Sequence, residues 1–238
     1  MNGRAAPDVA GIPGRVASVR ARIAAAAERA GRDPAEVTLV AAAKLQPVAA
    51  VRAAVAAGVP DIGENYAQEL AAKAAEVPGA RWHFIGRLQR NKVPVLVETS
   101  ALVHSLDSLP SARALGRRAH AAGTLARALV QVELDERAAA HGVPAGELGD
   151  FVAACRQTRG LEVIGLMLMP PPAPSAEATR PLFRRLAALA SKGDLRALSM
   201  GMTADFEVAV EEGATLVRVG TAIFGPRPAE KVARSGAG

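Results

Sequence analysis

Residues 37–58, VTLVAAAKLQPVAAVRAAVAAG, contain the pattern on which the fold prediction depends. The first seven residues, VTLVAAA, form a short apolar run of the kind found in buried strands. From residue 47 the chain reads PVAAVRAAVAAG, with valines three and four residues apart and a closing glycine, which predicts a helix. A buried strand followed at once by an amphipathic helix is the repeating unit of a parallel sheet.

The same unit recurs along the chain. Further strands are predicted at 60–65, 82–86, 101–107, 126–134, 162–169, 195–202 and 215–220. Helices are predicted at 67–77, 90–97, 111–123, 144–158, 177–191 and 203–213. Eight β-α units of parallel strands predict a (β/α)8 TIM-type barrel. An open, doubly wound sheet is the alternative.

An extra helix is predicted before the first strand, at 13–30. Val16, Val19, Ile23 and Ala27 have helical spacing there, and Gly31 ends the pattern. No linker interrupts the chain, and the proline-rich loop from Pro170 to Pro174 is interpreted as a stiff connection from a strand to a helix. We therefore expect residues 1–238 to form a single domain, with its core at about 37–225.

Composition narrows the setting. Half of the 238 residues are apolar but only 3% are aromatic, so the core must consist mainly of Ala, Val and Leu. The net charge of +6 is spread along the chain, so nucleic-acid binding is not expected. Cys155 is the single cysteine, and no signal peptide or membrane span is evident. These features predict a cytoplasmic protein without an intrachain disulfide.

Lys44 is the first candidate site residue. It ends an apolar run, and it is one of only five lysines in the chain. In a (β/α)8 barrel the active site lies at the C-terminal ends of the strands, which places Lys44 at the mouth. A lysine amine there can form a Schiff base with an aldehyde. The alternative is a strand-end lysine whose amine extends into solvent.

Two later stretches have the features of a phosphate site. LSMGMTADFE, at 198–207, supplies Ser199, Gly201 and Thr203, and RVGTAIFG, at 218–225, supplies Gly220 and Thr221. Loops after the seventh and eighth strands often bind phosphate in this fold. Glycines allow close backbone approach, and hydroxyl and N–H groups bind the anion. The alternative is two ordinary turns that need glycine.

Arg218 precedes the second of these loops. It shares one face of its strand with Leu216 and Gly220, so it points toward the barrel interior and needs a partner. That partner could be Glu133, Glu64 or a ligand. A lysine, an arginine and a phosphate site at one mouth fit pyridoxal 5′-phosphate (PLP) or a phosphorylated sugar. An arginine facing a ring nitrogen favours PLP.

Six segments together resemble one known family. They are LVAAAKLQP (39–47), IGENYAQE (62–69), WHFIGRLQRNK (82–92), HSLD (104–107), GLMLMPPPA (165–173) and the long stretch 198–225. In this order they are similar to the pyridoxal phosphate homeostasis proteins of the YggS/PROSC type. That family has the fold of the alanine racemase N-terminal barrel.

The resemblance implies a role for each matching residue. Lys44 would form the Schiff base with PLP, Asn65 would lie near the cofactor, and Arg218 would face the pyridine nitrogen. The phosphate would be held by Ser199, Gly201, Met202, Gly220 and Thr221. The family often has VSK where this chain has Ala42–Ala43–Lys44, which could alter a hydrogen bond beside the lysine. No catalytic residue and no metal ligand are implied.

The expected function is intracellular vitamin B6 homeostasis without strong catalytic activity. PLP-dependent apo-enzymes are possible partners, and the expected state is a monomer or weak dimer. A PLP-dependent amino acid racemase is the alternative. Racemases take a second acid–base group from a tyrosine in another domain, whereas the only tyrosine here is Tyr66. His83 and His104 lack metal-ligand spacing and are interpreted as packing residues.

Overall fold

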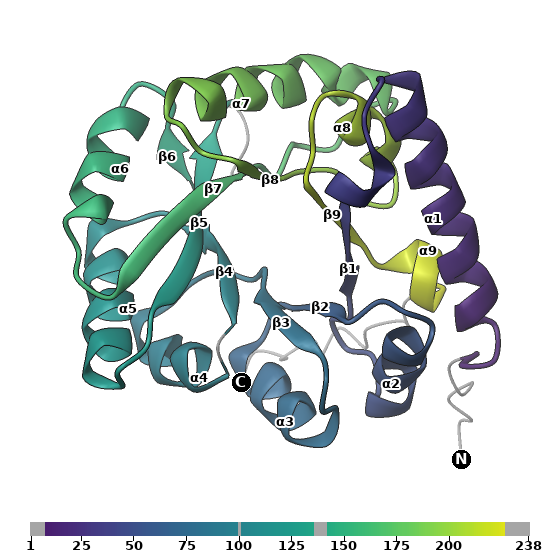
Figure 1. Ribbon diagram of the computed structural model, residues 1–238, viewed down its shortest axis with the longest axis horizontal. Helices are drawn as coiled ribbons and strands as arrows, with labels where there is room; N and C mark the ends of the chain where they lie inside the picture. Colours follow the sequence, from purple (N-terminus) through teal and green to yellow (C-terminus); the bar gives the residue numbers. More distant parts are fainter. Residues whose placement is uncertain (1–7, 100, 136–141, 227–238) are drawn as a thin grey trace, which may run out of the picture.

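The computed structural model describes residues 8–99, 101–135 and 142–226, which form a ring of parallel strands surrounded by helices (Figure 1). The ends of the predicted domain, 1–7 and 227–238, lie outside the described residues. Sheet order is β4-β3-β2-β1-β9-β8-β7-β5-β6, and pairing of β4 with β5 closes the ring. The predicted (β/α)8 barrel is therefore confirmed, and the open sheet is excluded.

Eight strands form the barrel, and each corresponds to a predicted one. They are β1 Thr38–Ala42, β2 Asp61–Glu64, β3 Arg81–Phe84, β4 Leu102–Leu106, β5 Ala126–Glu133, β7 Leu161–Met167, β8 Ala197–Ser199 and β9 Leu216–Val219. The two-residue strand β6, Val143–Pro144, pairs only with the end of β5 and was not predicted.

The helices cover the outer face of the barrel (Figure 1). They are α1 Ile12–Arg29, α2 Val48–Ala56, α3 Ala67–Glu76, α4 Val93–Glu98, α5 Leu109–Ala121, α6 Leu148–Arg156, α7 Arg180–Lys192, α8 Phe206–Glu211 and α9 Thr221–Phe224. Among the described residues no helix is both long and apolar enough to cross a membrane.

Helix α1 is the predicted extra N-terminal helix. Its buried stripe contains Val16, Val19, Ile23 and Ala27, as the spacing predicted. It packs on α2, α8 and α9, where it lies outside the ring of strands (Figure 1). Burial of each valine or isoleucine contributes about 1.5–3 kcal/mol, so this stripe holds the helix to the barrel.

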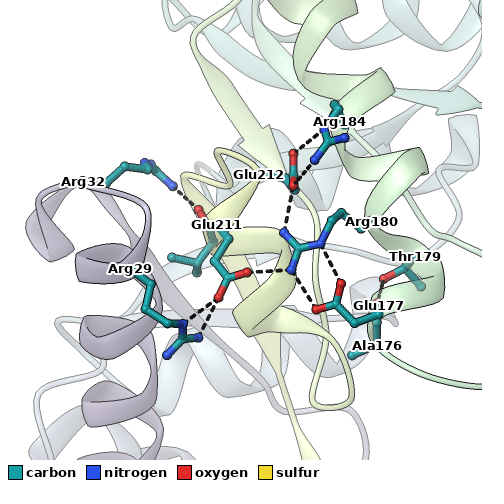
Figure 2. A network of polar contacts seen from close by, with 10 residues as sticks. Arg29, Arg32, Ala176, Glu177, Thr179, Arg180, Arg184, Glu211 and Glu212 are labelled. Atoms are coloured by element: carbon teal, nitrogen blue, oxygen red, sulfur yellow. Dashed lines mark hydrogen bonds and ion pairs between the residues drawn. The ribbon is translucent and has the colours of Figure 1, made fainter.

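A network of ion pairs ties α7 and α8 together and reaches α1 (Figure 2). Arg180 contacts Glu177, Glu211 and Glu212 at 2.7, 2.7 and 2.8 Å. Arg29 at the end of α1 pairs with Glu211 at 2.7 Å. The network therefore joins three helices that the sequence separates.

The two faces of each strand have different surroundings. Val217 and Val219 pack outward in the main core beneath the helices, whereas Leu216 packs inward with Val40, Leu129 and Met167. Arg218 alternates with the outward valines and pairs in register with Val40. The strand alternation thus places Arg218 inside the barrel, as predicted.

Candidate functional site

A cavity of about 330 Å³ lies at the C-terminal ends of the strands. Its wall combines side chains from loops that are far apart in the sequence. They include Lys44 after β1, Asn65 after β2, Met202 and Thr203 after β8, and Arg218, Gly220 and Thr221 in or after β9. The volume is in the usual range for small-molecule sites.

Lys44 lies in the turn between β1 and α2. Its side chain is half-buried, and Nζ is 5.4 Å from the ring centroid of Tyr66. The next residue, Leu45, has a left-handed backbone conformation with φ of 61°, and its N–H donates to Glu69 Oε2 at 3.2 Å. This conformation is costly for leucine, so the lysine-bearing turn stores some strain beside the cavity.

Arg218 is buried, with only 3% of its surface exposed. One guanidinium N–H donates to Ser199 Oγ at 2.5 Å and another to the carbonyl of Leu168 at 2.9 Å. Burial lowers the pKa of Arg218 to about 10, although the Asp205 carboxylate opposes this. The guanidinium is therefore still protonated at neutral pH, and it borders the cavity without Glu133 or Glu64 as its ion-pair partner.

The loop after β8 is shaped by Gly201. Its φ is +88°, and a Cβ there would lie 2.5 Å from Ala209 Cβ and 2.9 Å from Phe206 Cα. Only glycine avoids both the left-handed strain and these contacts. The structure thus gives Gly201 a shaping role behind the cavity, not a place in its wall.

Two other residues that were predicted to bind the phosphate have polar groups that already bond other residues. Ser199 is fully buried outside the cavity wall, where its hydroxyl contacts Arg218 and His104. Met202 lines the cavity, but its backbone N–H donates to Asp205 Oδ1 at 2.7 Å. Thr203, which was predicted to open the next helix, lies in the loop before that helix and lines the wall beside Met202.

Asn65 borders the cavity after β2, and Gly86 allows it to do so. A Cβ on Gly86 would lie 2.0 Å from the Asn65 carbonyl oxygen, which is far closer than two atoms can approach. Ser105 donates a hydrogen bond to the Gly86 carbonyl. The loop after β3 therefore packs tightly against the Asn65 backbone.

A buried ion pair lies behind the lysine-bearing turn. Lys73 Nζ is 2.6 Å from Glu64 Oε1, and it also donates to the Ala43 carbonyl at 3.1 Å. Burial raises the pKa of Glu64 to about 7, and the Lys73 ammonium opposes this shift. Among the described residues, Glu64 Oε2 is the buried side-chain atom without a hydrogen-bond partner. Through Ala43 the pair contacts the residue next to Lys44, but neither member of the pair lines the cavity.

The histidines were interpreted from sequence as packing residues, and the structure gives them a polar role. His83 and His104 are buried inside the barrel and hydrogen-bonded to each other at 2.9 Å. A signal was present, because His83 alternates with Trp82 and Phe84, which pack outward. Two histidines that point inward from neighbouring strands are expected to contact each other. Looking only for the sequence spacing of metal ligands misses this contact.

The structure brings most of the predicted residues together. Lys44, Asn65, Met202, Arg218, Gly220 and Thr221 all line the one cavity, whereas Ser199 and Gly201 lie behind it. Among the lining residues of the described chain, only Lys44 and Arg218 are ionisable. The wall thus offers amine, guanidinium, amide and hydroxyl groups, and it is suited to an anionic ligand with a carbonyl group.

Comparison with known proteins supports this arrangement. Residues 15–228 match the family model for the alanine racemase N-terminal domain. The pyridoxal phosphate homeostasis protein of Pseudomonas aeruginosa is 42% identical over 220 residues, covering 91% of this chain and 96% of the relative. The Escherichia coli K12 protein of the same name is 37% identical, covering 92% and 98%.

A solved structure agrees with both. PipY of Synechococcus elongatus with PLP bound has 36% identity and a TM-score of 0.78, and the match covers 90% of this chain and all of that one. Sequence identity above 35% over nine-tenths of the chain, together with the shared barrel, shows membership of the family and not only a shared fold. This chain belongs to the pyridoxal phosphate homeostasis protein family, within the larger family of alanine racemase N-terminal domains.

Proposed function

We propose that the protein binds PLP at the barrel mouth, with Lys44 as its covalent anchor, and serves intracellular vitamin B6 homeostasis. The observation that carries this proposal is that Lys44 and the buried cation Arg218 border the same cavity. The PLP-bound relative supports the choice of ligand. When bound, PLP supplies an aldehyde for a lysine amine, a pyridine ring and a dianionic phosphate.

The residues of the cavity fit these three parts. The Lys44 amine would be the group that holds the aldehyde carbon. Thr203 and Thr221 offer hydroxyls, and Gly220 lets the backbone approach the phosphate. Arg218 would face the ring nitrogen, and Asn65, which borders the same cavity, would lie near the cofactor.

Arg218 also sets the chemistry that the site supports. A guanidinium only donates hydrogen bonds, so a ring nitrogen facing it accepts and stays unprotonated. An unprotonated pyridine withdraws electrons poorly from a substrate carbanion. The described cavity wall also contains no carboxylate, imidazole or phenol to act as a second base. We therefore propose cofactor binding without strong catalysis.

Borohydride reduction tests the covalent anchor. The purified protein should show a visible absorption band, and reduction should fix a pyridoxyl group on the peptide that contains Lys44. Lys44→Ala should lose the adduct yet retain weak binding through the phosphate. An adduct on Lys73 or Lys92 would overturn the assignment of Lys44. If the protein is colourless and binds a phosphorylated sugar, the ligand is the sugar and not PLP.

A chiral assay tests the absence of strong catalysis. With excess protein and a panel of L-amino acids, we expect negligible racemisation, transamination or decarboxylation, because the second base is lacking. Substantial conversion that disappears in Lys44→Ala would establish the racemase alternative. Tyr66, whose ring lies near Lys44 Nζ, would then be the candidate base, and Tyr66→Phe the next variant.

We further propose that PLP-dependent apo-enzymes receive the cofactor from a monomer or weak dimer. The exposed mouth supports this, since Thr221 and Tyr66 are both solvent-accessible. Loaded protein should activate an apo-enzyme faster than the same concentration of free PLP. Equal or slower activation would restrict the role to storage.

A further inference from the structure

A line of hydrogen bonds crosses the barrel interior and ends at Arg218. Asp61 Oδ1 is 3.0 Å from His83 Nε2, and His83 Nδ1 is 2.9 Å from His104 Nε2. His104 Nδ1 is 2.8 Å from Ser199 Oγ, which accepts from Arg218. We call these five residues, Asp61, His83, His104, Ser199 and Arg218, the interior relay. All five are buried.

The two ends of the interior relay fix its direction. Asp61 is held by Arg81 through two contacts of 2.8 and 2.5 Å. Burial alone would raise the pKa of Asp61, but hydrogen bonds from His83 and Arg81 outweigh it and lower the pKa to about 2. Asp61 is thus a carboxylate, which only accepts, and Arg218 is a guanidinium, which only donates.

With both imidazoles neutral, one arrangement of protons satisfies every contact between these ends. His83 donates from Nε2 to Asp61, so its Nδ1 accepts from His104 Nε2. His104 Nδ1 then accepts the hydroxyl proton of Ser199, whose oxygen accepts from Arg218. Both imidazoles are then Nε2–H tautomers, and burial, which lowers the pKa of His104 well below its usual value, favours the neutral form of that ring.

We propose that Asp61, His83, His104 and Ser199 are positioning residues that orient Arg218 toward the ring of the bound ligand. Arg218 is a buried cation whose direct contacts are a hydroxyl and a carbonyl, and besides the Asp205 carboxylate it gains from any further negative charge whose influence reaches it. Hydrogen bonds in series polarise one another, so the relay extends the influence of Asp61 to the guanidinium. The inference rests on the proposed function, because the ring nitrogen is the atom that Arg218 faces.

This assignment changes the role of Ser199. Its resemblance to the family implied a phosphate contact, whereas its hydroxyl is committed here on both sides, to His104 and to Arg218. A phosphate contact would act only on phosphorylated ligands. A positioning contact acts through the ring, and so on PLP and pyridoxal alike.

Nitrogen NMR of the histidines tests the relay without any ligand. The chain has only four histidines, so His83→Gln and His104→Gln spectra are enough to assign both signals. We expect each of the two imidazoles to be protonated at Nε2 and unprotonated at Nδ1. A ring protonated at Nδ1, or at both nitrogens, would overturn the relay whether or not PLP binds.

Ligand binding tests the positioning role. Ser199→Ala should weaken PLP and pyridoxal by the same factor, about ten-fold, which is the low end for a hydrogen bond to a charged group. Thr203→Ala with Thr221→Ala should weaken PLP alone. Ser111→Ala is the matched control, since it removes a buried hydroxyl that bonds Ser108 outside both the relay and the cavity wall, and binding should stay unchanged. A Ser199→Ala effect confined to PLP would restore the phosphate assignment.

The far end of the relay gives the most specific outcome. Asp61→Asn keeps an acceptor oxygen for His83 but removes the charge. Nitrogen-labelled PLP in this variant should show a shifted ring-nitrogen signal, although Asp61 never touches the cavity. A signal identical to that of the wild-type protein would contradict the positioning role. If wild-type protein fails to bind PLP at all, the proposed function fails instead, and the histidine spectra still decide the relay.

Discussion

At the scale of single residues, the sequence located the ends of strands better than it located contacts in the barrel interior. Lys44 and Arg218 were predicted at the mouth, because strand ends and two-residue alternation are local properties. Ser199 was expected to face a phosphate and instead bonds His104. Which interior side chains meet depends on the stagger between strands, and no single stretch of sequence contains that information.

The strained turn beside Lys44 leads to a first prediction. Leu45→Asn should raise the free energy of unfolding by about 0.5–1 kcal/mol, because asparagine tolerates the left-handed region better than leucine. Urea unfolding of ligand-free protein measures this. Leu125→Asn is the control, since Leu125 is also an exposed leucine but lacks a positive φ. Equal effects in both variants would mean that lost surface hydrophobicity, and not backbone strain, is responsible.

At the scale of elements, the order and type of the barrel strands were predictable, and several boundaries were not. The helix predicted from residue 111 begins at Leu109, since Pro110 is favoured in a first helical turn. The helix predicted from 203 begins at Phe206, because Asp205 binds the Met202 N–H and holds the chain in a turn. Neither difference moves a strand end, so the site prediction was unaffected by them.

The ion-pair network between α7 and α8 leads to a second prediction. Arg180→Ala should lower the free energy of unfolding by about 1–2 kcal/mol, since the partly buried guanidinium joins three carboxylates. The loss should shrink at high salt, as charge screening grows. Arg184→Ala should cost clearly less than Arg180→Ala, because Arg184 is mostly exposed and, among the described residues, pairs with Glu212 alone. Similar losses for both arginines would show that the network adds nothing beyond single pairs.

At the scale of the whole molecule, the closed ring was predictable because eight successive β-α units are the number that closes a (β/α)8 barrel. The line of polar contacts behind Arg218 was not predictable, since composition indicated a core of small aliphatic residues. The structure satisfies both: aliphatic residues fill the layer beneath the helices, while a polar line runs through the barrel centre. One molecule therefore has an apolar outer core and a partly polar inner one.

Acid unfolding leads to a third prediction. The lowered pKa of Asp61 contributes stability that is present above the unfolded value near 3.8 and is lost as pH falls toward 2. The wild-type free energy of unfolding should therefore fall by about 2 kcal/mol from this group across that window. Asp61→Asn should be less stable at neutral pH and show a flatter profile between pH 4 and 2. Asp150→Asn, on the exposed face of α6, should keep the wild-type slope.

The buried pair of Lys73 and Glu64 bears on which lysine amine an aldehyde in the cavity can reach. Two lysines approach the same turn, because Lys73 Nζ bonds the carbonyl of Ala43 while Lys44 is the next residue in the chain. Lys73 Nζ lies 2.6 Å from Glu64 Oε1 and is buried behind the turn, outside the cavity wall, so an aldehyde in the cavity would not meet it. Lys44 has no such carboxylate in the cavity wall. On the proposed function, the buried pair would leave Lys44 as the amine that an aldehyde in the cavity meets, although Glu64 itself lies outside the cavity wall.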